Sequence, residues 1–177
     1  MIPGIPLATL TAIYTAYLFA QAKARDMWQN PLLPPHLFVQ ALLLGSAVML
    51  GVSALLGEFI RTERIRDPEA VRSTVYFLTW ILGITSLLHL LMIWGEVSLT
   101  HPTAHARLAI WEMVRGRYRS DFWFGTALSM LGALLPWLAI MGVISYTAGI
   151  AGAPLALIGL MLYENAYVQA GQSVPLA

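Results

Sequence analysis

Five long apolar runs, separated by polar segments, set the pattern of hydrophobic and polar positions along this chain of 177 residues. The runs lie near residues 5–21, 37–59, 74–96, 122–146 and 153–168. A helix of about 20 apolar residues crosses the hydrocarbon layer of a bilayer, and in lipid the backbone of such a segment must satisfy its own hydrogen bonds. The sequence therefore predicts a single all-α domain over residues 1–177, a polytopic transmembrane helical bundle of about five membrane helices.

The third run carries ionisable side chains within an apolar segment. On a helix, Ser86, His89 and Glu96 follow one another at steps of three and seven, so they form a polar stripe on one face. Ionisable groups are costly in lipid and mark a functional site by default. We therefore predict that these three residues belong to a proton path. The alternative is that they only hydrogen-bond to neighbouring helices.

Two further carboxylates are proton-path candidates because they lie at the edges of apolar runs. Glu58 stands where the second run meets the charged segment RTERIRDPEAVR, and Glu164 stands where the fifth run turns polar. At a membrane boundary beside Arg61, an interfacial ion pair is the favoured interpretation of Glu58, because its side chain can reach water there.

The first run carries small residues at strict four-residue spacing: Ala8, Ala12, Ala16 and Ala20. Such a face lets two helix backbones approach closely. The first run is therefore predicted to be an internal, packed helix.

The longest polar connection, HPTAHARLAIWEMVRGRYRSDFW, joins the third and fourth runs. Ala104, Leu108 and Trp111 fall at helical spacing and arginines cluster around them. This pattern predicts one interfacial amphipathic helix in the headgroup region, over Arg107 to Arg119.

Composition and charge narrow the class of protein. Hydrophobic residues make up 58% of the chain and charged residues 11%, against roughly 25% charged in a soluble domain. The net charge of +1 gives no basis for binding nucleic acid. The chain has no cysteine, which excludes a disulfide, a thiolate metal site and a protein-held iron–sulfur cluster. Six basic residues on the side of the C-terminus against four on the other favour a cytoplasmic C-terminus by a small margin.

The histidines do not predict a cofactor or metal site. A transmembrane haem needs two axial imidazoles at depth, whereas only His89 lies well inside a run and His36, His101 and His105 lie at segment ends. His101 and His105 are four apart and could share a metal, but Pro102 lies between them and no third ligand stands at the right spacing. No catalytic motif occurs either. The remaining polar groups suit proton relay or an apolar ligand with polar ends, such as a quinone.

Residues 4–47, GIPLATLTAIYTAYLFAQAKARDMWQNPLLPPHLFVQALLLGSA, resemble the NrfD/polysulfide-reductase (PsrC-like) membrane-anchor family. That family has a G-x-x-x-x-x-x-T-A-x-Y-T helix, an A-R-x-x-W link and an L-P-x-L-F helix start. Gly95-Glu96 at the end of a run, GRYRSDFWFG at the start of the next, Pro136 and the closing YVQAGQSVPL fit the same family.

The resemblance implies a membrane-anchor subunit of a respiratory oxidoreductase complex in the prokaryotic cell (inner) membrane. Its partners would be an iron–sulfur subunit, a molybdopterin catalytic subunit and other membrane subunits. Its redox ligand would be a quinone, menaquinone or ubiquinone, with proton translocation through the polar stripe. Because the family has more spans, in two helical bundles, the chain resembles the C-terminal portion. The alternatives are a structural scaffold subunit without its own quinone or proton chemistry, and half of a secondary transporter.

Overall fold

The computed structural model describes residues 3–175 apart from 61–67, and within α2 and α3 it leaves the side chains of 56–60 and 68 undescribed. The elements in chain order are α1 (Gly4–Gln21), the 3-10 helix η1 (Asp26–Gln29), α2 (Leu33–Ile60), α3 (Pro68–Ser98), α4 (Ala104–Val114), α5 (Arg119–Ile140), α6 (Tyr146–Gly149) and α7 (Gly152–Ser173). No strand occurs within the described residues, so the predicted all-α class is confirmed.

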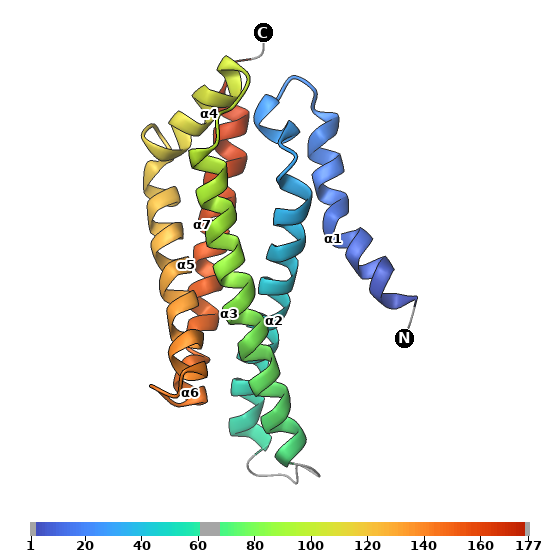
Figure 1. Cartoon of the computed structure of the whole chain (residues 1–177), viewed down its shortest axis with the longest axis vertical. Helices are drawn as coiled ribbons and strands as arrows, with labels where there is room; N and C mark the ends of the chain where they lie inside the picture. The colour runs from blue at the N-terminus through green and yellow to red at the C-terminus, as the bar shows by residue number, and fades with distance from the viewer. Residues whose placement is uncertain (1–2, 61–67, 176–177) are drawn as a thin grey trace.

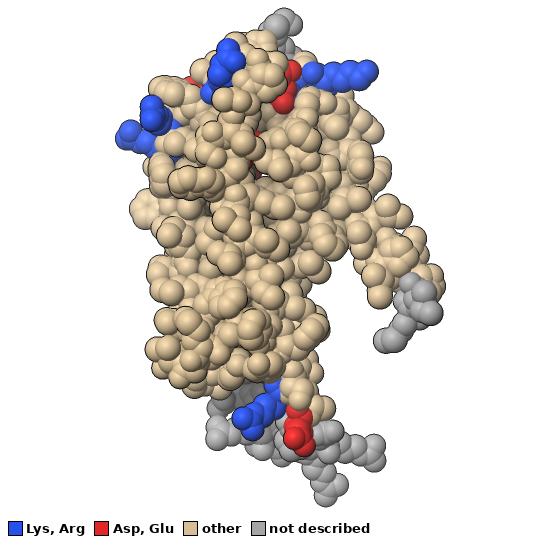
Figure 2. Space-filling view, viewed as in Figure 1, with Lys and Arg blue, Asp and Glu red and all other residues tan. Residues whose placement is uncertain are grey.

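Four helical stretches are long and apolar enough to cross a membrane: Leu33–Leu55, Glu69–Ser98, Arg119–Ile140 and Tyr146–Ser173. They correspond to α2, α3, α5 and α6 with α7, and the long helices stand side by side in one bundle (Figure 1). Figure 2 shows Lys and Arg gathered at the two ends of the bundle, with a band of almost entirely uncharged residues between them on this face. This arrangement confirms the predicted multi-pass membrane protein.

The first predicted span, α1, is the exception to the bundle. It packs against α2 and η1, and towards its N-terminal end it diverges from the other helices (Figure 1). Within α1 the buried residue is Ala16, while Leu7, Leu10 and Tyr14 are exposed. The prediction of an internal helix is therefore wrong for the described residues, although the predicted alanine face is the side that packs: Ala16 is buried and Ala12 and Ala20 are half-buried.

Helices α5 and α7 approach each other closely. A Cβ added at Gly132 would lie 2.6 Å from the amide nitrogen of Ala156, and one added at Gly159 would lie 2.6 Å from that of Ser129. Glycine is thus required at both positions by the nearness of the other backbone, as in close membrane helix pairs. This approach fixes how α7 presents its side chains to the bundle interior.

Helix α2 begins earlier than the predicted residue 37. Pro34 and Pro35 lie in its first turn, where proline is tolerated because the first amides of a helix have no intrahelical partner. The early start places His36 inside the helix rather than in the preceding loop.

The predicted interfacial helix is α4, but its bounds differ from residues 107–119. Thr103 caps its N-terminus, since its hydroxyl accepts a hydrogen bond from the amide of Ala106, and Arg119 already belongs to α5. Helix α4 lies across one end of the bundle (Figure 1), with Met113 buried and Trp111 exposed. An exposed Trp among arginines fits a headgroup location, which stays a prediction.

Candidate functional site

The predicted polar stripe of α3 faces the interior of the bundle. Ser86, His89 and Glu96 are each at most 2% exposed, whereas Leu88 and Leu91 on other faces are exposed. The helical spacing read from the sequence thus placed the three polar residues correctly. What these residues can do depends on the side chains of neighbouring helices that contact them.

His89 is paired with a second histidine that the sequence analysis left out of the site. The Nε2 of His36 lies 2.8 Å from the Nδ1 of His89 in a buried hydrogen bond. The ring of Tyr163 on α7 packs against both imidazoles, with centroids 5.6 Å from His36 and 5.2 Å from His89. Three helices therefore meet at this point.

The expectation that only His89 lies at depth is wrong, since His36, in the first turn of α2, is 2% exposed and bonds to His89. Pro34-Pro35 could have indicated that a helix begins before His36. The pairing itself depends on how far α2 and α3 are offset along each other, which no sequence signal gives.

Glu96 lies nearer the α4 end of the same stripe and contacts two other segments. Its Oε2 accepts a hydrogen bond from the side-chain amide of Asn30 at 2.5 Å. Its backbone oxygen lies 2.8 Å from the Nε2 of His101, which donates to it. Neither Asn30 nor His101 was predicted to act with Glu96.

Two candidates remain, Glu164 and Glu58. Glu164 on α7 accepts a hydrogen bond from the side-chain amide of Gln40 on α2, at 2.5 Å. The side chain of Glu58 lies outside the described residues. Glu164 is therefore a separate carboxylate contact, and the role of Glu58 stays a prediction.

We call His36, Ser86, His89, Glu96 and Tyr163 the buried polar cluster. Four of its polar atoms are buried and find no hydrogen-bond partner among the described residues: Ser86 Oγ, His89 Nε2, Glu96 Oε1 and Tyr163 Oη. Buried polar atoms are nearly always satisfied by protein, ordered water or a ligand. The cluster thus offers donors and acceptors of the kinds that hold and pass protons.

The cluster does not have the arrangement of a metal or haem site. No group of three or more His, Asp or Glu side chains comes together within the described part of the chain. The nitrogens of His36 and His89 bond to each other instead of facing each other across a haem plane. His101 and His105 have different partners, since the Nε2 of His101 lies 2.8 Å from the Glu96 backbone oxygen and the Nδ1 of His105 lies 3.8 Å from a carboxylate oxygen of Asp26.

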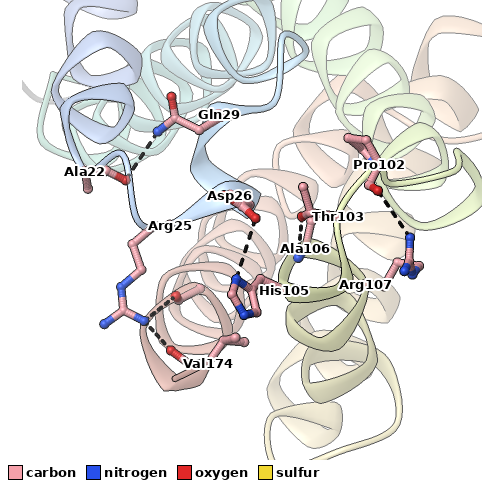
Figure 3. A network of polar contacts seen from close by, with 11 residues as sticks. Ala22, Arg25, Asp26, Gln29, Pro102, Thr103, His105, Ala106, Arg107 and Val174 are labelled. Carbon is pink, nitrogen blue, oxygen red and sulfur yellow. Dashed lines mark hydrogen bonds and ion pairs between the residues drawn. The ribbon is translucent and has the colours of Figure 1, made fainter. Parts of the chain in front are cut away.

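Polar contacts at the α4 end hold the surrounding segments together (Figure 3). The guanidinium of Arg25 donates to the backbone oxygens of Gly171 and Val174, at 3.2 and 2.5 Å. These carbonyls lie at the C-terminal end of α7, where the helix dipole favours a cation. Arg25 therefore anchors the segment before η1 to α7, close to the end of the buried polar cluster.

Comparisons with known proteins give one family. The family described as "Polysulphide reductase, NrfD" matches residues 1–175. A protein of Halobacterium salinarum, named as a membrane subunit of a dimethyl sulfoxide reductase, is 27% identical over 140 residues, which cover 77% of this chain and 30% of that protein. The chain thus spans under a third of the length of this relative. No solved structure matches.

Proposed function

Because the chain belongs to the polysulphide reductase NrfD family, we propose that it serves as a membrane-anchor subunit of a respiratory oxidoreductase complex in the prokaryotic cell membrane. In this proposal it links the complex to a quinone and provides a path for protons. The name of the haloarchaeal relative, a reductase membrane subunit, supports the anchor role. With no cysteine in the chain to hold an iron–sulfur cluster, we place the iron–sulfur centres, and the molybdopterin centre of the complex, in partner subunits.

The buried polar cluster is the observation that carries the proposal. A bound quinone supplies two-electron chemistry, and each reduction to the quinol takes up two protons. The residues of this chain could deliver or accept those protons, since His89 Nε2, Glu96 Oε1 and Tyr163 Oη are buried and have no hydrogen-bond partner among the described residues. Along α3, His89 and Glu96 are two turns apart, about 10.5 Å at the rise of an α-helix, which a chain of waters and side-chain hydroxyls can bridge.

A scaffold role is the second candidate, and a specific observation favours it. The hydrogen bonds of Asn30 with Glu96, His36 with His89 and Gln40 with Glu164 each join two different segments of the bundle. Interhelical polar contacts of this kind stabilise membrane bundles without any chemistry.

Purification and mutagenesis separate the two roles. The tagged chain is purified from native membranes, and co-purification of an iron–sulfur subunit is expected; its absence would contradict the anchor proposal. Glu96→Gln keeps size and hydrogen bonding but removes titration, so we expect the complex to assemble while quinone-coupled activity falls by about 100-fold or more. Ser98→Ala, at an exposed position on the same helix, is the matched control.

The opposite result favours the scaffold. If quinone-coupled activity is retained in Glu96→Gln while Glu96→Leu fails to assemble, then Glu96 stabilises helix packing and carries no proton.

A further inference from the structure

A cavity of about 500 Å³ opens at the α4 end of the bundle. One wall is the segment from η1 to the start of α2, and the other is the segment that joins α3 to α4. Figure 3 shows part of its rim, where Asp26 and Thr103 lie on the facing segments. The volume greatly exceeds the roughly 30 Å³ that one water occupies in the liquid, so the cavity has room for a chain of waters.

Two residues of this cavity wall also contact Glu96. Asn30 donates to the Glu96 carboxylate, and His101 lies on the Glu96 backbone oxygen. Glu96 is itself 2% exposed and does not line the cavity, so the hydrogen bond from Asn30 connects its carboxyl group to the cavity wall. The Oε1 of Glu96 has no protein partner among the described residues, which leaves it free to accept a hydrogen bond from water.

The wall of the cavity is mainly apolar, and polar groups gather at its rim. At the rim, His105 and Asp26 lie 3.8 Å apart, and the Arg107 guanidinium donates to the backbone oxygen of His101 at 3.1 Å. The titratable groups that interact electrostatically with Glu96 are His101 beside it and, from α7, Tyr163 and Tyr167.

We propose that this cavity is the water entrance through which Glu96 exchanges its proton with the aqueous phase on the α4 side of the membrane. In this exchange the carboxyl O–H bond breaks, the proton passes to a water oxygen, and the carboxylate left behind keeps the hydrogen bond from Asn30. Asn30 is the positioning residue that holds the carboxyl group behind the cavity wall. The inference rests on the proposed function in one respect, that Glu96 carries a proton.

The absence of cysteine in the chain makes the entrance testable by chemical blocking. Thr100 lines the cavity and is exposed, so Thr100→Cys creates a single thiol of this chain at its mouth. The purified complex is reconstituted in lipid and treated with a bulky water-soluble thiosulfonate. Exchange of the Glu96 carboxyl proton in heavy water is then followed as the infrared signal that Glu96→Gln lacks. Ser98→Cys, exposed at the end of α3 outside the cavity, and the treated unsubstituted chain are the controls.

Labelling the thiol of Thr100→Cys is expected to slow exchange of the Glu96 carboxyl proton by about tenfold or more. In this proposal the carboxyl group is otherwise surrounded by packed protein and lipid, which contain no water. The label at Ser98→Cys should leave the rate unchanged. Equal exchange rates in the two labelled variants would overturn the entrance, as would the lack of any carboxyl signal specific to Glu96 at every pH tested.

Quinone-coupled activity of the Glu96→Gln variant separates this inference from the proposed function. If that activity falls while blocking has no effect on exchange, the entrance is wrong and the proton role of Glu96 stands. If activity is unchanged while blocking slows exchange, the cavity is confirmed as a water entrance and the proton role in the proposed function fails.

Discussion

The contact between α5 and α7 gives a sharp prediction for Gly159→Ala. The added Cβ would lie 2.6 Å from the amide nitrogen and hydroxyl of Ser129 and 2.8 Å from the backbone oxygen of Gly125. Ordinary van der Waals contact begins near 3.4 Å, so the two backbones must separate by about 0.8 Å. Since two of these atoms are backbone atoms, no side-chain rotation relieves the contact.

The expected magnitude follows from two opposing effects of Gly159→Ala. Overpacking of this kind costs about 1–3 kcal/mol, whereas replacing glycine by alanine within a helix returns about 1 kcal/mol. The variant should therefore have a free energy of unfolding lower by up to about 2 kcal/mol. Gly45→Ala is the matched control, because no atom lies within 4 Å of its added Cβ, and it should be as stable as the parent or slightly more so.

The assay is reversible unfolding in mixed micelles, followed by the fluorescence of the six tryptophans. Equal stability of the Gly159→Ala and Gly45→Ala variants would refute the close approach of α5 and α7. The same contact bears on function, since a Cβ at Gly125 would lie 2.8 Å from the amide nitrogen of Tyr163. Under the proposed function, we therefore expect Gly159→Ala also to lower quinone-coupled activity by displacing Tyr163 from the buried polar cluster.

Three further outcomes can be measured on single variants. Gln40→Leu removes the donor to Glu164 and leaves a carboxylate unpaired, so it should lower the free energy of unfolding by about 1–3 kcal/mol, and Gln40→Glu should not restore it. Arg25→Ala removes the two bonds to the end of α7, so limited proteolysis should trim the C-terminal residues of the variant faster than those of the parent. Arg117→Cys should react with a membrane-impermeant thiol reagent from the cytoplasmic face; reaction from the opposite face alone would reverse the predicted topology.

Several features of the fold could be predicted from the sequence because they depend on short-range physics. The length and hydropathy of an apolar run decide whether a helix can span the bilayer, and the observed α3 and α7 contain the predicted runs 74–96 and 153–168. The period of the helix likewise decided that Ser86, His89 and Glu96 share one face, and that face is buried.

Where local signals were equivocal, the prediction was less accurate. The alanine face of α1 indicated an internal helix, yet only the inner part of that face is covered and the rest of α1 is mostly exposed. A small-residue face shows that a helix can approach another closely, but it does not show which helix is present. The bounds of α4 shifted in the same way, because the arginines at 115–119 belong to a turn and to the next helix rather than to one amphipathic helix.

The sequence by itself determined the class of this protein, its membrane helices and the polar face of α3, since each follows from composition and from periodicity within one segment. Only the tertiary structure decided the partners of that face: His36 for His89, Asn30 for Glu96 and Gln40 for Glu164. These pairs join residues between 53 and 124 positions apart. They depend on the axial offset of neighbouring helices, and this offset is fixed by packing such as the glycine contact of α5 with α7, which no single segment encodes.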